Sequence, residues 1–302
     1  MRLKELLFPA VFAVICFSCK KDSGGGDEGP KIRPVTPNSG RFISKVFEYS
    51  PAPGQFIGES AGTPEGANSI VGTRSGLISL GAYGGYIVFG FDHSILNQTG
   101  ADLAIYGNPV PEPRPWSEPG VVMVSQDENE NGLPDDNWYE LAGSGYVTPA
   151  TIRNYKITYY NPRGVSRVSW IDNRGKTGAV EINEFHDHSY YPAFAANQDS
   201  LTFEGTLLIP TFGEHDGIYI NWAMGWGYAD NYSTDDTEMM DSYQKNQYNS
   251  FDLSWAIDKN GTPVTLKAID FVKVYTGQNS VGSNIMGEVS TEISGAADLN
   301  MK

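Results

Sequence analysis

The chain has 302 residues, of which 40% are hydrophobic and 12% aromatic, and its formal net charge is −15. This composition supplies a packed core for one large all-β domain or two smaller ones. The acidic balance argues against nucleic-acid binding and against electrostatic attachment to an anionic membrane, since both need clustered Lys and Arg.

The first residues predict export. A basic start at residues 1–4 precedes an apolar run at 6–17 that is too short to span a membrane, and Ser18 and Cys19 follow. We expect residues 1–18 to be a signal peptide and Cys19 to become the lipidated first residue. The pattern resembles bacterial lipoproteins, although Cys16 replaces the more usual leucine. It implies a lipid-anchored protein at the outer membrane and cell surface; a plain signal peptide or an N-terminal anchor is the alternative.

The two cysteines both lie within the first nineteen residues. The exported domain must therefore be stabilised by its core or by a metal, without disulfides. Residues 19–39 are glycine-rich, charged and then proline-punctuated, which predicts a lipidated flexible tether. The domain is expected to span residues 40–302.

Short strand-like runs separated by Gly, Asn, Asp or Pro fill the rest of the chain, and no segment has a sustained helical period. These runs cover residues 86–91, 103–106, 121–124, 155–160, 168–171, 201–203, 206–209, 218–220, 251–257, 264–266 and 271–275. Residues 258–261, with the sequence DKNG, predict a hairpin turn. The pattern predicts an all-β fold, a jelly-roll-like β-sandwich in a single domain.

Residues 127–136, with the sequence DENENGLPDD, predict a calcium loop. Oxygen-bearing side chains occupy positions one, three, five and nine, glycine at position six permits a sharp turn, and the seventh residue offers its carbonyl. The loop resembles the aspartate-rich loops of thrombospondin-type and dockerin-like repeats. Position twelve is Trp138, so a nearby carboxylate or water must complete the shell. The predicted ligands of this structural Ca²⁺ are Asp127, Asn129, Asn131, Leu133, Asp135, Asp136 and Glu140. The alternative is a solvated hairpin loop without metal.

A second metal candidate is the pair His186 and His188, with His215 further along the chain. Histidines two apart on a strand share one face, so both can reach one metal ion. The alternative is a polar surface loop.

The segment 221–232 alternates aromatic residues with glycines, an arrangement that presents flat faces to a sugar ring or another flat ligand. The predicted ligand contacts are Trp222, Trp226, Tyr228 and Asn231. Burial of the tryptophans in the core is the alternative. The sequence carries no nucleophile elbow, zinc-protease motif or phosphate-binding glycine loop. Pairs of carboxylates for glycoside cleavage are spatial, so the sequence selects none.

Several segments together resemble a family of Bacteroidetes cell-surface lipoproteins. They are GYIVFGFD (85–92), GADLAIYGN (100–108), SEPG (117–120), WYELAGS (138–144) and DFVKVY (270–275). The resemblance implies a secreted ligand-binding β-sandwich, associated with outer-membrane nutrient uptake loci. We therefore expect a surface lipoprotein that binds a small-molecule or glycan ligand and passes it to an outer-membrane transporter. The alternatives are a cobalamin-binding accessory lipoprotein, a polysaccharide hydrolase and a structural or adhesive surface protein.

Overall fold

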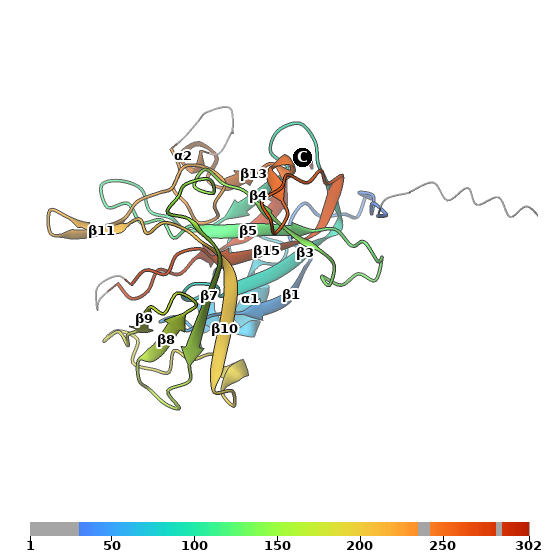
Figure 1. The fold of residues 1–302 in the computed structure, drawn as a ribbon. Coiled ribbons are helices and arrows are strands. Elements are labelled where there is room, and N and C mark those ends of the chain that lie inside the picture. The colour runs from blue at the N-terminus through green and yellow to red at the C-terminus, as the bar shows by residue number, and fades with distance from the viewer. Residues whose placement is uncertain (1–29, 235–241, 282–285, 302) are drawn as a thin grey trace, which may run out of the picture.

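The computed structural model describes residues 30–234, 242–281 and 286–301. The predicted signal peptide and Cys19 lie outside these residues. The fold is all-β and sandwich-like, as predicted, and its sheets are antiparallel (Figure 1). Within the described ranges, no helix combines the length and apolar character needed to cross a membrane.

The strands are β1 (Lys45–Ser50), β2 (Ile78–Ser79), β3 (Tyr86–Leu96), β4 (Leu103–Tyr106), β5 (Gly120–Ser125), β6 (Trp138–Leu141), β7 (Ile152–Tyr160), β8 (Val168–Asp172), β9 (Thr177–Val180), β10 (Ser200–Leu207), β11 (Phe212–His215), β12 (Ile218–Asn221), β13 (Asn249–Phe251), β14 (Ala256–Ile257), β15 (Ala268–Thr276), β16 (Glu292–Ile293) and β17 (Gly295–Asp298). The helices are α1 (Pro64–Ala67) and α2 (Tyr243–Asn246), with the 3-10 turns η1 (Ser60–Gly62), η2 (Asn68–Ile70), η3 (Ala193–Ala195) and η4 (Leu253–Trp255).

A six-stranded sheet forms the middle of the molecule, in the order β1-β3-β15-β5-β6-β14. Its central strands are almost continuously apolar because both faces are covered. In β5, Val122 and Val124 belong to the core on one face, whereas Val121 and Met123 pack on the other.

The first face packs against a three-stranded sheet, β13-β4-β17, and the short pair β16-β2. The core between them joins side chains that are far apart in the sequence, including Phe89, Leu103 and Ile293, each without solvent exposure.

The second face contacts a four-stranded sheet, β10-β7-β8-β9, which lies toward one end of the molecule (Figure 1). Tyrosines dominate this interface. The Tyr83 ring meets Tyr155 edge-on at 5.0 Å, and the Tyr159 hydroxyl donates to the carbonyl of Tyr83. The hairpin of β11 and β12 projects from the body of the fold (Figure 1).

Most predicted strands are found, but two near the C-terminal end differ. The strand predicted at 251–257 is interrupted by η4, because the Asp252 side chain accepts from the amide of Ser254 and caps a 3-10 turn. Residues 264–266 are not a strand: the pairing next to the predicted turn at 258–261 stops at a single bridge between Ile257 and Pro263. The amides of Asp258 and Val264 donate to the carbonyls of Thr262 and Ala256 on either side of this bridge, and the pairing extends no further.

The predicted tether is partly folded onto the domain. The backbone of Arg33 exchanges hydrogen bonds with Ser94, and its guanidinium lies 2.9 Å from a carboxylate oxygen of the buried Asp270. Arg33 thus contacts the domain although it precedes the boundary predicted at residue 40. The buried carboxylate of Asp270 requires a positively charged partner, and Arg33 supplies it, so this part of the chain packs against the domain.

Candidate functional site

The loop between β5 and β6 folds around the predicted calcium ligands. The two carboxylate oxygens of Asp127 accept from the amides of Asn131 and Gly132, at 3.0 and 2.9 Å. The side-chain amides of Asn129 and Asn131 both donate to the carboxylate of Asp135, at 3.0 and 2.9 Å. Four of the predicted ligands thus converge, and Gly132 has a φ of 73° at the turn.

The donor set of this loop fits a hard cation because its side chains offer oxygen ligands. Asp127 is buried, and its own amide donates to Asp270, so the first position is anchored to the central sheet. The side-chain NH2 groups of Asn129 and Asn131 contact Asp135. A bound cation would instead be coordinated by the carbonyl oxygens of these two side chains.

The remaining predicted ligands lie in different places. Asp136 accepts from the amide of Glu128 at the start of the loop, and Leu133 is exposed at its tip. Glu140 belongs to another site: its carboxylate accepts from the hydroxyl of Thr206 on β10. The assignment of Glu140 as a loop ligand is corrected, because its place in β6 points it to the junction between the sheets.

The predicted aromatic site is divided between core and surface. Tyr228 is buried, and its hydroxyl accepts from the amide of Gly145. Asn231 is fully buried; its side chain accepts from the amide of Met224 and donates to the carbonyls of Met224 and Gly225. These two residues hold the loop together, and their burial removes them from a ligand-contacting surface.

Trp222 is the member that faces solvent, with 41% of its surface exposed. It follows β12, and its indole leans across Gly213 on β11: a Cβ at Gly213 would lie only 3.0 Å from the ring. Trp226 is half-buried against Trp255, with ring centroids 4.7 Å apart. The structure therefore leaves one open aromatic face in this segment.

Two hollows flank that indole. One, of about 340 Å³, lies between Trp222 and the hairpin tip at His215 and Asp216. The other, of about 360 Å³, extends toward Tyr232 and Gln244. Trp222, Glu112 and Pro115 line both, so these three residues form a ridge, here called the Trp222 ridge.

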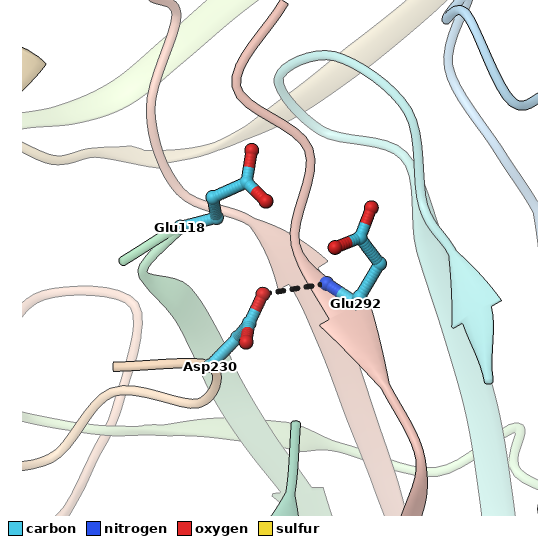
Figure 2. A group of neighbouring side chains, drawn as sticks. All are labelled: Glu118, Asp230 and Glu292. Carbon is cyan, nitrogen blue, oxygen red and sulfur yellow. Dashed lines mark hydrogen bonds between the residues drawn. The ribbon is translucent and has the colours of Figure 1, made fainter. Parts of the chain in front are cut away.

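A cluster of three buried carboxyl groups lies in the interior (Figure 2). Glu118 precedes β5, Asp230 follows β12 and Glu292 begins β16, and one oxygen from each lies within 4.8 Å of the others. The amide of Glu292 donates to Asp230 Oδ2, and the amide of Glu118 donates to the backbone carbonyl of Asp230. Gly107 leaves room for the Asp230 carboxylate, since a Cβ there would lie 2.6 Å from its Oδ1.

Burial raises the pKa of Glu118, Asp230 and Glu292, and the neighbouring carboxyl groups raise it further for Glu118 and Asp230. Three carboxyl groups this close together in the interior cannot all be ionised unless a positive charge lies beside them. The cluster can either share protons or exchange them for one hard divalent cation, for which three oxygen ligands are a suitable donor set.

A hollow at the junction of the two large sheets contains Glu140. Its walls include Trp138, Tyr146 and Arg153, and the carboxylates of Glu204 and Asp258 also line it. Burial raises the pKa of Glu140 to about 7. Backbone amides of the hairpin turn lower the pKa of Asp258. One hollow thus brings together two carboxyl groups with opposite tendencies to hold a proton.

The predicted histidine site is also divided. His186 and His188 lie near each other in the loop after β9, with ring centroids 6.4 Å apart. His215 is on the β11–β12 hairpin, where it is exposed and its Nε2 is 3.5 Å from Asp216.

Sequence reasoning missed the three-carboxyl cluster because its members are far apart along the chain. Glu118 lies in a segment quoted above only for its family resemblance. Neither a scan against protein-family models nor a search of curated proteins finds a match to this chain.

Proposed function

We propose that the protein is an exported, lipid-anchored surface protein that carries a structural Ca²⁺ in the loop at 127–136 and binds a nutrient ligand, a glycan, at the Trp222 ridge. The outer-membrane address rests on the basic, apolar and Ser18-Cys19 pattern of the N-terminus. Delivery to an outer-membrane transporter is the expected step after binding.

The exposed indole of Trp222 carries the binding proposal. An open aromatic face between two hollows stacks on the apolar face of a sugar ring. Glu112 and Asp216 stand in the wall of the first hollow and offer carboxylate oxygens to sugar hydroxyl groups. The absence of a side chain at Gly213 lets the indole approach the hairpin closely.

The test is a glycan array followed by calorimetric titration of the hits, with cobalamin titrated in parallel. We expect glycan binding that Trp222→Ala weakens at least tenfold. Phe194→Ala is the matched control, because Phe194 is 50% exposed and lies elsewhere, on η3. Binding of cobalamin alone would select the accessory-lipoprotein alternative. Recovery of protein partners without any small ligand would select the adhesive one.

A second candidate function is polysaccharide hydrolysis, favoured by the hollow that contains Glu140. A carboxyl group that holds its proton near neutral pH can donate it to a glycosidic oxygen, while Asp258, whose pKa is lowered, acts as base or nucleophile. Release of reducing ends by the wild type and its loss in Glu140→Gln would establish this activity. Trp222→Ala with unchanged turnover on a soluble oligosaccharide would separate the two sites.

A further inference from the structure

A hollow of about 420 Å³ lies beside the turn between β8 and β9, and none of the sites above uses it. Ile152, Leu207 and Pro210 give it an apolar wall, and Arg174 and Lys176 line it from the turn. Two cations thus meet at one hollow in a chain whose formal net charge is −15. The lining combines an apolar surface with local positive charge.

The backbone of the β8–β9 turn is held in one conformation. Oδ1 of Asp172 accepts from the amides of Arg174 and Lys176, at 2.9 and 2.8 Å. The amide of Gly175 donates to the carbonyl of Asp172, and Gly175 has a φ of 82°, which a glycine adopts without steric cost. The two cationic side chains therefore project from a fixed base, so a ligand that they bind has to order only the side chains.

A hydrogen-bonded network forms the polar part of the hollow. The hydroxyl of Tyr155 donates to Oδ2 of Asp172 and accepts from the side-chain amide of Asn279, both at 3.1 Å. Burial raises the pKa of Tyr155 to about 12, so this hydroxyl keeps its proton at neutral pH. In the part of the chain that the structure describes, no protein group is hydrogen-bonded to the side-chain oxygen of Asn279 or to the hydroxyl of Ser280, and both residues line the hollow. These two oxygens can bond hydroxyl groups of a ligand.

Arg174 and Lys176 differ from neighbouring cations of the four-stranded sheet in their lack of a carboxylate partner. Lys156 and Arg167 each form an ion pair with a glutamate, whereas across the described residues neither Arg174 nor Lys176 forms such a pair. Among the described residues that line the hollow, Asp172 is the one carboxylate, and both of its oxygens are engaged in the hydrogen bonds above. The lining thus carries two positive charges and one negative charge, and the excess of one matches a monoanion.

We propose that this hollow binds a sugar acid through its carboxylate. The planar guanidinium of Arg174 suits a carboxylate because it offers two parallel hydrogen bonds, and the ammonium of Lys176 supplies a further charged donor. The apolar wall receives the C–H face of the sugar ring, and Asn279 and Ser280 bond its hydroxyl groups. The hollow shares no described lining residue with the two hollows at the Trp222 ridge, so the inference does not depend on the proposed function.

The test is calorimetric titration of the full chain with glucuronate and with a trisaccharide that ends in glucuronate, each beside its methyl ester. The ester keeps the ring and removes the negative charge. We expect both acids to bind and the esters to bind at least about tenfold more weakly, since they lose hydrogen bonds between charged groups. Tighter binding of the trisaccharide would assign the site to the end of a glycan, and equal affinity would assign it to a free sugar acid.

Substitutions test which side chains hold the acid. Arg174→Ala and Lys176→Ala should each weaken its binding by about tenfold. Arg167→Ala and Lys156→Ala are the matched controls, because they remove the same charges from exposed positions near the same sheet and leave the hollow intact. Both control variants should bind the acid as the wild type does.

NMR spectra of the nitrogen-labelled chain locate the ligand. Glucuronate should shift the side-chain signals of Asn279 and Arg174 and leave the indole N–H signal of Trp222 unchanged. Absence of binding by either acid, equal affinity for acid and ester, or an equal loss in the control variants would overturn the proposal. So would a loss of acid binding in Trp222→Ala.

Discussion

The hydroxyl of Thr206 donates a 2.6 Å hydrogen bond to Oε2 of Glu140 across the junction between the four-stranded and six-stranded sheets. Glu140 is enclosed there by Tyr275 and Met123, and burial raises its pKa to about 7. The two layers are therefore joined at a carboxyl group whose charge changes near neutral pH.

The first prediction concerns pH. Burial raises the pKa of Glu140 and Glu292 to about 7 and that of Glu288 to about 8, from an ordinary value of 4.5. Between pH 4.5 and these raised pKa values, the folded chain binds more protons than the unfolded chain. The contribution of these three groups to the free energy of unfolding is therefore fully present below about pH 4.5 and is lost as the pH rises through 7 to 8. Urea unfolding of the metal-free protein should give a lower free energy at pH 8 than at pH 5.5.

Glu140→Gln should flatten that dependence by about 2 kcal/mol, since each pKa unit corresponds to roughly 1.4 kcal/mol. Glu204→Gln, on an exposed side chain of the same hollow, is the control and should leave the slope as it is. A slope of the opposite sign would refute this account of the buried carboxyl groups.

The second prediction concerns calcium. Saturating Ca²⁺ should raise the melting temperature, because an ion at 100 times its Kd stabilises the folded state by about 2.7 kcal/mol. Asp127→Ala should abolish the rise, since Asp127 is the buried first position of the loop. Glu118→Gln should retain it, which separates the loop from the three-carboxyl cluster. A melting curve that a chelator leaves unchanged would remove the calcium proposal.

The third prediction distinguishes the exposed Trp222 from the buried Tyr228 and Asn231, which stabilise the loop. Tyr228→Phe should lower the free energy of unfolding by about 1–3 kcal/mol, because the amide of Gly145 loses its buried acceptor. Asn231→Ala should cost more, since three backbone groups lose a partner. Neither substitution should change ligand affinity in the folded fraction, whereas Trp222→Ala should change affinity with little effect on chemical denaturation.

The fourth prediction tests the folded end of the tether. A chain shortened to begin at residue 40 should be less stable than one shortened to begin at residue 30. Arg33→Ala alone should cost roughly 1–2 kcal/mol, because the partly exposed guanidinium contacts the buried Asp270. Equal unfolding midpoints for the two shortened chains would show that the contact contributes nothing.

The sequence was sufficient for fold class because apolar runs such as those in β3, β5 and β15 are local signals. It was insufficient where a single side chain determines the local backbone conformation. Asp252, for example, caps η4 and so interrupts the predicted strand. It also divided one strand into two: residues 201–203 and 206–209 overlap a single β10, which has a register shift between Gly205 and Leu207. Chain spacing alone did not distinguish a bulge from a turn.

For the sites, local patterns predicted a calcium loop at 127–136, and the structure brings four of the predicted ligand residues together through hydrogen bonds within the loop. They could not bring Glu118 to Asp230 and Glu292, because that contact depends on how distant segments of the chain are arranged in the fold. Nor could they show that Tyr228 and Asn231 turn inward, since the same residue types serve a binding face and a loop support equally well.

β15 lies between β3 and β5 in the central sheet and supplies hydrogen bonds to both, although it begins only at Ala268. Until β15 has been synthesised, β3 and β5 each lack the neighbour that pairs with one of their edges. A chain that ends before β15 should therefore be degraded by proteases more readily than the full chain, and the domain should fold as a whole only after its last portion has been synthesised.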